Sequence, residues 1–218
     1  ISENTKKDII KFYGIEESKI EVIYWATTLK PPQKKVNLDL PKKYIMFVGN
    51  RGKYKNFNRF INACTPLLKD DLELNIVCAG SSAFSKEEKK KFEEEGLGGR
   101  VLHVRFKDDE ELACIYSSAI CLVYPSLYEG FGSPILEAFS CGCPIVLSNR
   151  SSLPEIGGDA VVMFNPEDEK SIVNSVVEVV YDKKLRESMI KKGKERVKMF
   201  TYDRTIDNYL KVFREISR

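Results

Sequence analysis

The stretch Pro-Ser-Leu-Tyr-Glu-Gly-Phe-Gly-Ser-Pro-Ile-Leu-Glu-Ala at residues 125–138 decides the fold of this chain. An apolar run at residues 119–124 precedes it and predicts a buried strand, and a Pro-initiated segment at residues 134–140 predicts a helix. A glycine-rich turn between them lets backbone N–H groups approach an anion closely. The stretch therefore predicts a strand–turn–helix unit of an open α/β sheet, in which ligands bind outside the carboxyl ends of the strands.

The same alternation of short apolar runs and longer helical patterns extends through most of the chain. Strands are predicted at residues 20–25, 44–49, 74–80, 101–106, 119–125, 144–148 and 160–164. Several runs are apolar on both faces, which is typical of parallel strands covered by helices on both sides. Helices are predicted at residues 5–13, 57–68, 86–95, 110–118, 134–140, 167–181, 183–200 and 202–216. The pattern predicts an α/β fold with a Rossmann-like, doubly wound parallel sheet.

Three parts of the chain are distinguished by their composition. Residues 1–40 are interpreted as an interdomain segment that ends in a Pro- and Lys-rich linker at residues 29–35, and residues 41–200 as the ligand-binding domain. Residues 201–218 are interpreted as a C-terminal helix with one apolar stripe, formed by Ile206, Tyr209, Leu210, Phe213 and Ile216. Packing of this stripe on its own sheet is the default, and packing on an absent N-terminal domain is the alternative.

Charge and hydropathy exclude some classes of partner. The 35 basic and 32 acidic residues leave a net charge of +3, which does not predict a nucleic-acid binder. The apolar runs are shorter than the roughly 18–20 residues of a membrane span, and no signal peptide opens the chain. Because the first residue is Ile, we expect the chain to begin within a longer protein or to have been trimmed.

The cysteines and the single histidine predict no metal site. The pattern of six cysteines favours reduced thiols in a cytoplasmic protein, because four lie in apolar runs where a thiol acts as a small hydrophobe. Cys141 and Cys143 form the only close pair, and their one-residue gap does not suit zinc. His103 sits in a strand pattern, which indicates a structural role, and the acidic run at residues 108–111 is interpreted as a helix cap.

Two stretches carry side chains suited to a phosphorylated sugar ligand. Glu137 lies one turn into the helix after the glycine-rich turn, where a carboxylate can accept hydrogen bonds from a ribose diol, and Glu129 precedes the glycines. The loop at residues 49–56 follows another predicted strand and offers Arg51 and Lys55 to phosphate oxygens, although it lacks the Gly-Lys-Ser/Thr of a Walker A loop. The plainer alternatives are a capping and a solvated glutamate in one stretch and a basic surface loop in the other.

Taken together, these stretches resemble the C-terminal, donor-binding half of the family 4 (group 1) retaining glycosyltransferases. Residues 129–138 look like the E-x7-E motif in its E-G-F-G-x-P-x-x-E-A form, and residues 141–146 look like its A-x-G-x-P-V continuation. Residues 152–156 with 158–160 resemble the next signature, residues 49–55 the basic loop after the first strand of the domain, and Ser2-Glu3-Asn4 the entry segment. The likeness covers nearly the whole chain, and its specific part is residues 129–160.

The resemblance implies a GT-B fold, of which this chain is the nucleotide-sugar-binding half. It implies catalytic roles at the diphosphate and the transferred sugar for Arg51, Lys55 and Glu129, and it implies no metal cofactor. Glu137 would hold the ribose, and the remaining substrate-binding positions would be Gly49, Arg105, Phe106, Lys107, Gly130, Phe131, Gly132, Ser133 and Pro134. The expected partners are a nucleotide diphosphate sugar and, through the N-terminal domain, a glycan or lipid-linked acceptor. A cytoplasmic location follows, and peripheral contact with the inner face of the membrane is left open.

Two departures and two alternatives accompany the resemblance. Residues 24–27 stand where the family often has a Pro-Asn-Gly-Val-like turn, and Arg51 comes two residues after Gly49, where many members have it one after. The expected function is transfer of a hexose, with mannose as one candidate, in bacterial surface polysaccharide synthesis, and the chain alone is expected to be inactive. The alternatives are a nucleotide-sugar 2-epimerase of related fold and a non-catalytic scaffold module that binds nucleotide.

Overall fold

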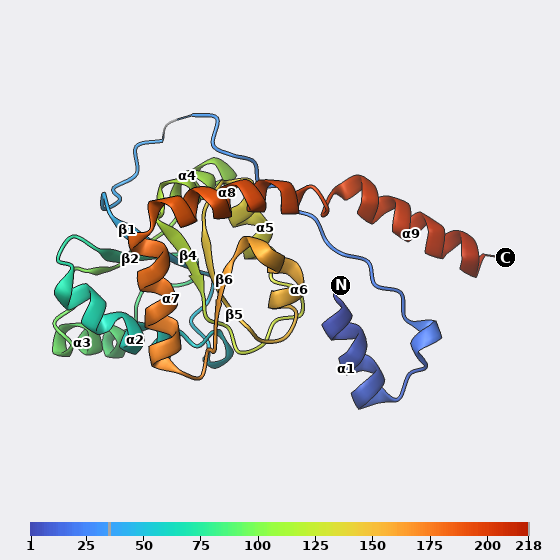
Figure 1. Cartoon of the computed structure of the whole chain (residues 1–218), viewed down its shortest axis with the longest axis horizontal. Helices are drawn as coiled ribbons and strands as arrows, with labels where there is room; N and C mark the ends of the chain where they lie inside the picture. The colour runs from blue at the N-terminus through green and yellow to red at the C-terminus, as the bar shows by residue number, and fades with distance from the viewer. Residues whose placement is uncertain (35, 218) are drawn as a thin grey trace.

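The computed structural model contains one parallel six-stranded sheet, with strand order β3-β2-β1-β4-β5-β6 (Figure 1). It describes residues 1–34 and 36–217. Lys35, at the end of the predicted linker, and Arg218, at the end of the predicted C-terminal segment, lie outside the described residues. The strands are β1 Tyr44–Val48, β2 Asn75–Ala79, β3 Val101–Val104, β4 Cys121–Tyr124, β5 Ile145–Ser148 and β6 Val162–Phe164. The prediction of a doubly wound parallel sheet is confirmed.

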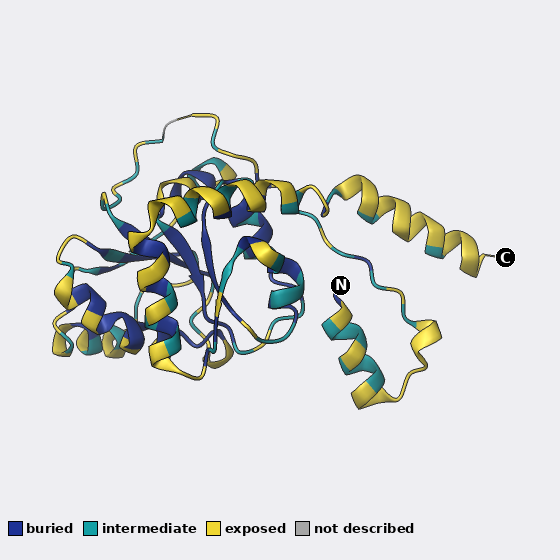
Figure 2. Cartoon of the chain, in the orientation of Figure 1, coloured by how far each residue is buried: buried dark blue, intermediate teal, exposed yellow. Residues whose placement is uncertain are grey.

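Helices cover both faces of the sheet, and each face has its own hydrophobic core. Side chains alternate along β1: Met46 and Val48 belong to the core that contains α4, α5 and α6, and Ile45 and Phe47 to the core that contains α2, α3 and α7. Figure 2 shows the strands buried in the middle and the outer helix surfaces exposed. The helices are α1 Glu3–Tyr13, α2 Phe57–Asp70, α3 Lys86–Glu94, α4 Asp109–Ser118, α5 Ser133–Ser140, α6 Leu153–Gly157, α7 Glu169–Tyr181, α8 Lys183–Val197 and α9 Tyr202–Ile216.

Two sequence-based assignments of secondary structure were wrong. The predicted strand at residues 20–25 is irregular chain, because it joins no edge of the sheet, although Ile23 within it is buried. Helix α6 was not predicted, because it has only five residues and contains Pro154. The other differences are small shifts at element ends, such as α7, which begins at Glu169 after Asp168 caps its first turn.

Helices α1 and α9 lie outside the layered domain (Figure 1). Neither helix contains a buried residue, and the segment that follows α1 runs from the short η1 helix Glu17–Lys19 back to the domain. The hydroxyl group of Thr205 in α9 donates a hydrogen bond of 2.9 Å to the carbonyl oxygen of Tyr24. The first turn of α9 is therefore joined to the segment that follows α1.

Candidate functional site

The site lies where the strand order reverses, between β1 and β4. Strands β1 and β4 are adjacent and parallel, so the loops that follow them leave the sheet side by side. The backbone N–H of Leu127 in the β4 loop donates a 2.8 Å hydrogen bond to the carbonyl oxygen of Tyr54 in the β1 loop. Open α/β sheets bind their ligands at this switch point, so the fold brings the two predicted loops together at the expected place.

The two loops meet in an ion pair. The ammonium group of Lys55, at the end of the η2 helix Lys53–Lys55, lies 2.7 Å from Oε1 of Glu129 and donates a 2.9 Å hydrogen bond to the Tyr124 hydroxyl. The side chains of Lys55 and Glu129 are 10% and 13% exposed. Burial and the nearby Glu129 charge raise the pKa of Tyr124, so its hydroxyl stays neutral. A cation and a carboxylate are thus held at the switch point with little access to water.

The backbone around Glu129 is fixed by two serines that precede α6. The N–H of Glu129 donates to Oγ of Ser151 at 2.9 Å. The fully buried hydroxyl of Ser152 lies within hydrogen-bonding distance of the carbonyl oxygens of Glu129 (2.9 Å) and Phe131 (3.0 Å). These contacts hold the predicted glycine-rich turn in one conformation without a ligand.

Gly132 allows helix α5 to begin directly at the end of this turn. Its φ of +100° is one that residues with a side chain rarely adopt, and a Cβ atom there would lie 2.9 Å from Cδ2 of Leu153. Ser133 and Pro134 form the first turn of α5, where the absence of an N–H on proline costs no hydrogen bond. Helix α5 thus begins four residues after Glu129, directly at the end of the glycine-rich turn.

Glu137 lies one turn further along α5 and is partly buried. The Tyr116 hydroxyl, from α4, donates a 2.8 Å hydrogen bond to Oε2 of Glu137. Burial raises the pKa of Glu137, the Tyr116 hydrogen bond opposes this effect, and the charge of Asp109 adds to it. Oε1 of Glu137 has no hydrogen bond within the described residues, so one carboxylate oxygen is available to a diol.

Arg51 does not join this group. Its Nε lies 2.6 Å from Oε1 of Glu88 in α3, its Nη2 donates to the carbonyl of Ala83, and its guanidinium lies 4.8 Å from the ring centroid of Phe84. The side chain is 7% exposed, and no partner of Nη1 is found in the described part of the chain. Arg51 therefore links the β1 loop to α3, and among the described residues it makes no hydrogen bond to Lys55 or Glu129.

The other predicted residues lie at the same edge of the sheet. Gly49 directly follows β1 with a φ of +94°, and its N–H donates to the carbonyl oxygen of Ala79. Arg105, Phe106 and Lys107 follow β3, the edge strand, which lies two positions from β1. Arg105 and Lys107 are exposed and Phe106 is half-buried. These residues lie two strands away from the switch point.

Sequence reasoning missed several residues that support the site. Tyr124 and Tyr116 were assigned only as parts of a strand and a helix, yet their hydroxyls contact Lys55 and Glu137. The supporting serines, Ser151 and Ser152, precede α6, and only Ser152 lies within the predicted signature at residues 152–160. Their spacing does not indicate which backbone groups they contact.

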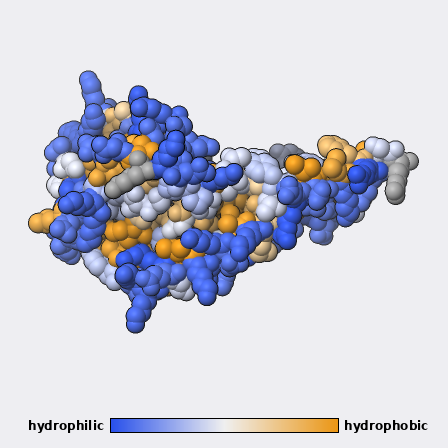
Figure 3. All heavy atoms as spheres, turned by 90° about the horizontal axis from the view of Figure 1, so that it is seen from above, coloured by the Kyte–Doolittle hydropathy of each residue, from blue (hydrophilic) through white to orange (hydrophobic). Residues whose placement is uncertain are grey.

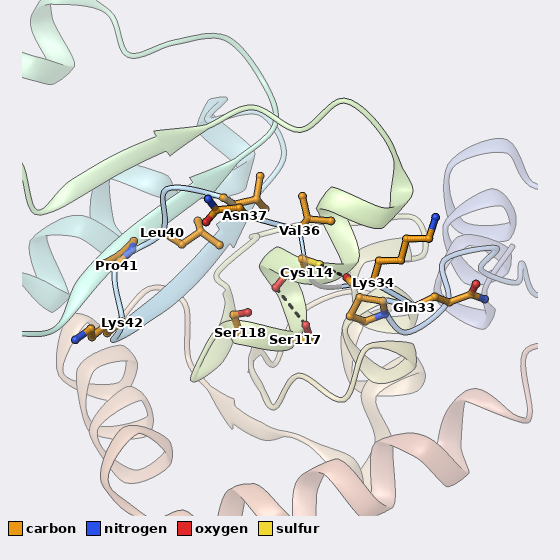
Figure 4. Close-up of a pocket in the computed structure, with 12 residues that line it drawn as sticks. Gln33, Lys34, Val36, Asn37, Leu40, Pro41, Lys42, Cys114, Ser117 and Ser118 are labelled. Atoms are coloured by element: carbon orange, nitrogen blue, oxygen red, sulfur yellow. Dashed lines mark hydrogen bonds between the residues drawn. The ribbon is translucent and has the colours of Figure 1, made fainter.

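Two cavities differ in their position relative to the predicted site residues. A cavity of about 540 Å³ lies between residues 32–42 and the end of α4 (Figure 4). It borders the amino ends of β1 and β4, opposite to the switch point, and none of the predicted site residues lines it. A pocket of about 200 Å³ lies beside Arg51 at the amino end of α2.

No helix within residues 1–34 and 36–217 is long and apolar enough to cross a membrane. The same residues contain no cluster of three His, Cys, Asp or Glu side chains that could hold a metal ion.

Comparison with known proteins identifies the family. Residues 31–196 match the model of the glycosyl transferases group 1 family. The chain belongs to the group 1 glycosyltransferases. This assignment confirms the resemblance stated from the motifs and agrees with a C-terminal GT-B domain.

Two curated relatives and one solved structure illustrate the match. The chain is 32% identical over 162 residues to O-antigen chain mannosyltransferase B of Escherichia coli. The aligned region covers 73% of this chain and 42% of that protein. It is 31% identical over 172 residues to O-antigen chain mannosyltransferase RfbU of Salmonella typhimurium, covering 78% and 47%. The chain thus spans about half the length of these relatives. TarM of S. aureus, in a complex with UDP and alpha-GlcNAc-glycerol, has the same fold with a TM-score of 0.83 at 16% identity, over 98% of this chain and 43% of TarM.

Proposed function

We propose that this chain is the donor domain of a retaining hexosyltransferase that acts in bacterial surface polysaccharide synthesis. The observation that carries the proposal is the Lys55–Glu129 pair at the switch point, next to the amino end of α5. Membership of the group 1 family supports transfer from a nucleotide diphosphate sugar. The names of the two O-antigen relatives support mannose as the sugar and a surface glycan as the product.

Each group has a role that follows from its chemistry. Lys55 and the backbone amides at the start of α5 would neutralise the charge that develops on the diphosphate as the bond to the anomeric carbon breaks. The acceptor hydroxyl oxygen forms the new bond to that carbon, and its proton passes to the departing nucleotide diphosphate. Glu129 would contact the hydroxyls of the transferred sugar, and Glu137 would accept hydrogen bonds from the ribose through Oε1. Residues 105–107 would contact the base.

The proposal assigns no metal to the site and changes the part assigned to Arg51. Lys55 and the α5 amides supply positive charge where a nucleotide-sugar enzyme with a metal would place its cation. Transfer by the full-length protein is therefore expected to proceed unchanged in the presence of EDTA. Nε and Nη2 of Arg51 are already engaged by Glu88 and Ala83, so Arg51 enters the proposal as a support of the loop that carries Lys55.

Transfer is proposed to need the remainder of the protein. The chain spans about half of the relatives' length, and α9 displays an apolar stripe without a partner in the described residues. Figure 3 shows hydrophobic side chains along one side of the arm that α9 forms. We propose that the N-terminal domain covers this stripe, whose exposed members are Tyr202, Ile206, Tyr209, Leu210, Phe213 and Ile216. The acceptor, a glycan or a lipid-linked glycan, would bind through that domain in the cytoplasm, with peripheral contact at the inner membrane face.

A thermal-shift screen tests nucleotide binding first. The chain is measured with GDP, UDP, ADP and their hexose conjugates, at about 100 times the dissociation constant, where binding adds about 2.7 kcal/mol. At this size the midpoint should rise by about 5–10 °C with one nucleotide. The same screen on the Lys55→Met variant should give a much smaller rise.

Product analysis on the full-length protein tests the reaction. A free nucleotide diphosphate and a glycosylated acceptor are expected. A changed sugar on an intact nucleotide would identify an epimerase and overturn the proposal. No turnover by a full-length protein that still binds nucleotide would favour the scaffold module.

A further inference from the structure

The first turn of α1 is attached to the domain by one carboxylate. Oε1 of Glu155, in α6, accepts hydrogen bonds from the N–H of Glu3 (2.8 Å) and the hydroxyl of Tyr24 (2.7 Å), and Oε2 lies 3.3 Å from the N–H of Asn4. The amino end of a helix favours such a negative charge. Helix α1 has no fully buried residue, and these polar contacts are part of its attachment to the domain.

The same turn of α1 also holds the loop that contains Glu129. The fully buried Ser2, which caps α1, lies 2.6 Å from the carbonyl oxygen of Gly130, and the Thr5 hydroxyl donates to the same oxygen at 3.1 Å. A Cβ atom on Gly130 would lie 3.2 Å from Cδ1 of Ile1, so the chain end presses closely on this position. The Tyr128 hydroxyl adds a hydrogen bond to Asp8.

Helix α6 connects both sets of contacts. Ser151 and Ser152, which precede it, hold the backbone of Glu129, and Glu155 holds α1 from the helix itself. The guanidinium of Arg196 in α8 donates to the carbonyl oxygens of Glu155 and Ile156, which fixes α6 to the domain. A shift of α1 would therefore act on the Gly130 carbonyl, one residue from the carboxylate that pairs with Lys55.

We infer that Glu155 is a positioning residue, which locks the first turn of α1 to the Glu129–Gly130 loop and so sets the position of Glu129 for sugar transfer. The inference rests on the proposed function, because it assigns Glu155 an effect on the transfer step. Glu155 touches neither Lys55 nor Glu129, so it acts through α1 and the loop. Movement of the interdomain segment is therefore expected to change the rate of sugar transfer without changing nucleotide binding.

The variant Glu155→Gln, in the full-length protein, tests the inference. Three donors converge on the two carboxylate oxygens, and an amide would place its own N–H₂ against at least one of them. Hydrogen exchange measured by mass spectrometry should become about tenfold faster at residues 2–5 and 128–131, because a hydrogen bond to a charged group is lost. The kcat for transfer should fall by a similar factor, while nucleotide affinity stays within about twofold.

Asp159→Asn is the matched control, because Asp159 is exposed, lies close to α6 in sequence and pairs with Lys192 instead of α1. It should leave exchange and kcat at the wild-type values. If Glu155→Gln unfolds, Tyr24→Phe removes one donor to the carboxylate, and Gly130→Ala pushes Ile1 away. Each should reproduce the faster exchange at residues 128–131.

The result that overturns the inference is unchanged exchange at residues 128–131 and unchanged kcat in these variants. Failure of the proposed function has a different signature: the wild-type protein then neither binds nucleotide nor transfers sugar. The exchange comparison still reports whether Glu155 couples α1 to the loop in that case.

Discussion

The ammonium group of Lys55 lies 2.7 Å from Oε1 of Glu129, and both side chains are nearly buried. The two residues are 74 positions apart in sequence and come from the loops after adjacent strands. Each compensates the charge of the other, so the ligand-free site avoids an isolated buried ion. A diphosphate that binds to Lys55 would take the place of Glu129 as its anion and leave that carboxylate to the sugar hydroxyls.

Replacement of Lys55 by Met should damage both the fold and the reaction. The carboxylate of Glu129 would remain buried without its cation, which costs about 3 kcal/mol in the free energy of unfolding. Transfer by the full-length protein should fall at least about 100-fold, because the developing phosphate charge loses its counter-ion. Urea unfolding and initial rates measure the two effects. Lys53→Met, at an exposed lysine two residues earlier, is the control, and an equal loss there would contradict the assignment.

Arg51 should matter more for stability than for nucleotide binding. Its guanidinium pairs with Glu88 and lies against Phe84, so Arg51→Gln leaves Glu88 without its partner and should lower the free energy of unfolding by about 2 kcal/mol. Nucleotide affinity, measured by calorimetry, should change less than about threefold, well under the tenfold that corresponds to 1.4 kcal/mol. Loss of nucleotide binding with unchanged stability would show that Arg51 contacts the phosphates directly.

The sequence predicted the sheet, and it predicted that Lys55 and Glu129 follow strands at the carboxyl edge of that sheet, for one physical reason. The ion pair between the two side chains was not predicted. Strands buried on both faces have no polar alternation, so they appear as continuous apolar runs, and the residues that follow them share one edge of the sheet. The run at residues 20–25 was wrongly predicted to be a strand because its composition suits one. Strand pairing depends on an available sheet edge, which the sequence does not reveal.

The supporting contacts could not be predicted in the same way. Glu88 and Arg51 are 37 residues apart, and Glu88 also caps α3, which explains its presence without any partner. Glu155 is separated from Glu3 by 152 residues and lies in a five-residue helix that has no periodic pattern. Such pairings depend on how helices and loops pack against one another, and a single sequence carries no readable signal of that packing.

Gly132→Ala should destabilise the turn before α5. The substitution forces a side chain onto a φ of +100° and places its Cβ 2.9 Å from Leu153, so the free energy of unfolding should fall by about 2–3 kcal/mol. Gly99→Ala is the control, because its φ is +73° but its Cβ would meet no atom within 4 Å. Chemical denaturation of both variants separates backbone strain from the clash. Equal losses would mean that contact with Leu153 contributes nothing.

Glu137→Gln should make the ligand-free protein more stable and its nucleotide binding weaker. Burial raises the pKa of Glu137 in the folded state, so ionisation at neutral pH costs stability, and an uncharged amide removes that cost while still accepting the Tyr116 hydrogen bond. The cost disappears as the pH falls through the folded pKa, so wild type and variant should become equally stable below about pH 4.

In the Glu137→Gln variant the ribose hydroxyls lose a charged acceptor, so nucleotide affinity should fall about tenfold. Thermal unfolding from about pH 3 to about pH 8, together with calorimetry, measures both effects. A variant that is less stable than wild type at pH 7 would show that the carboxylate stabilises the fold, and unchanged affinity would remove Glu137 from the ribose site.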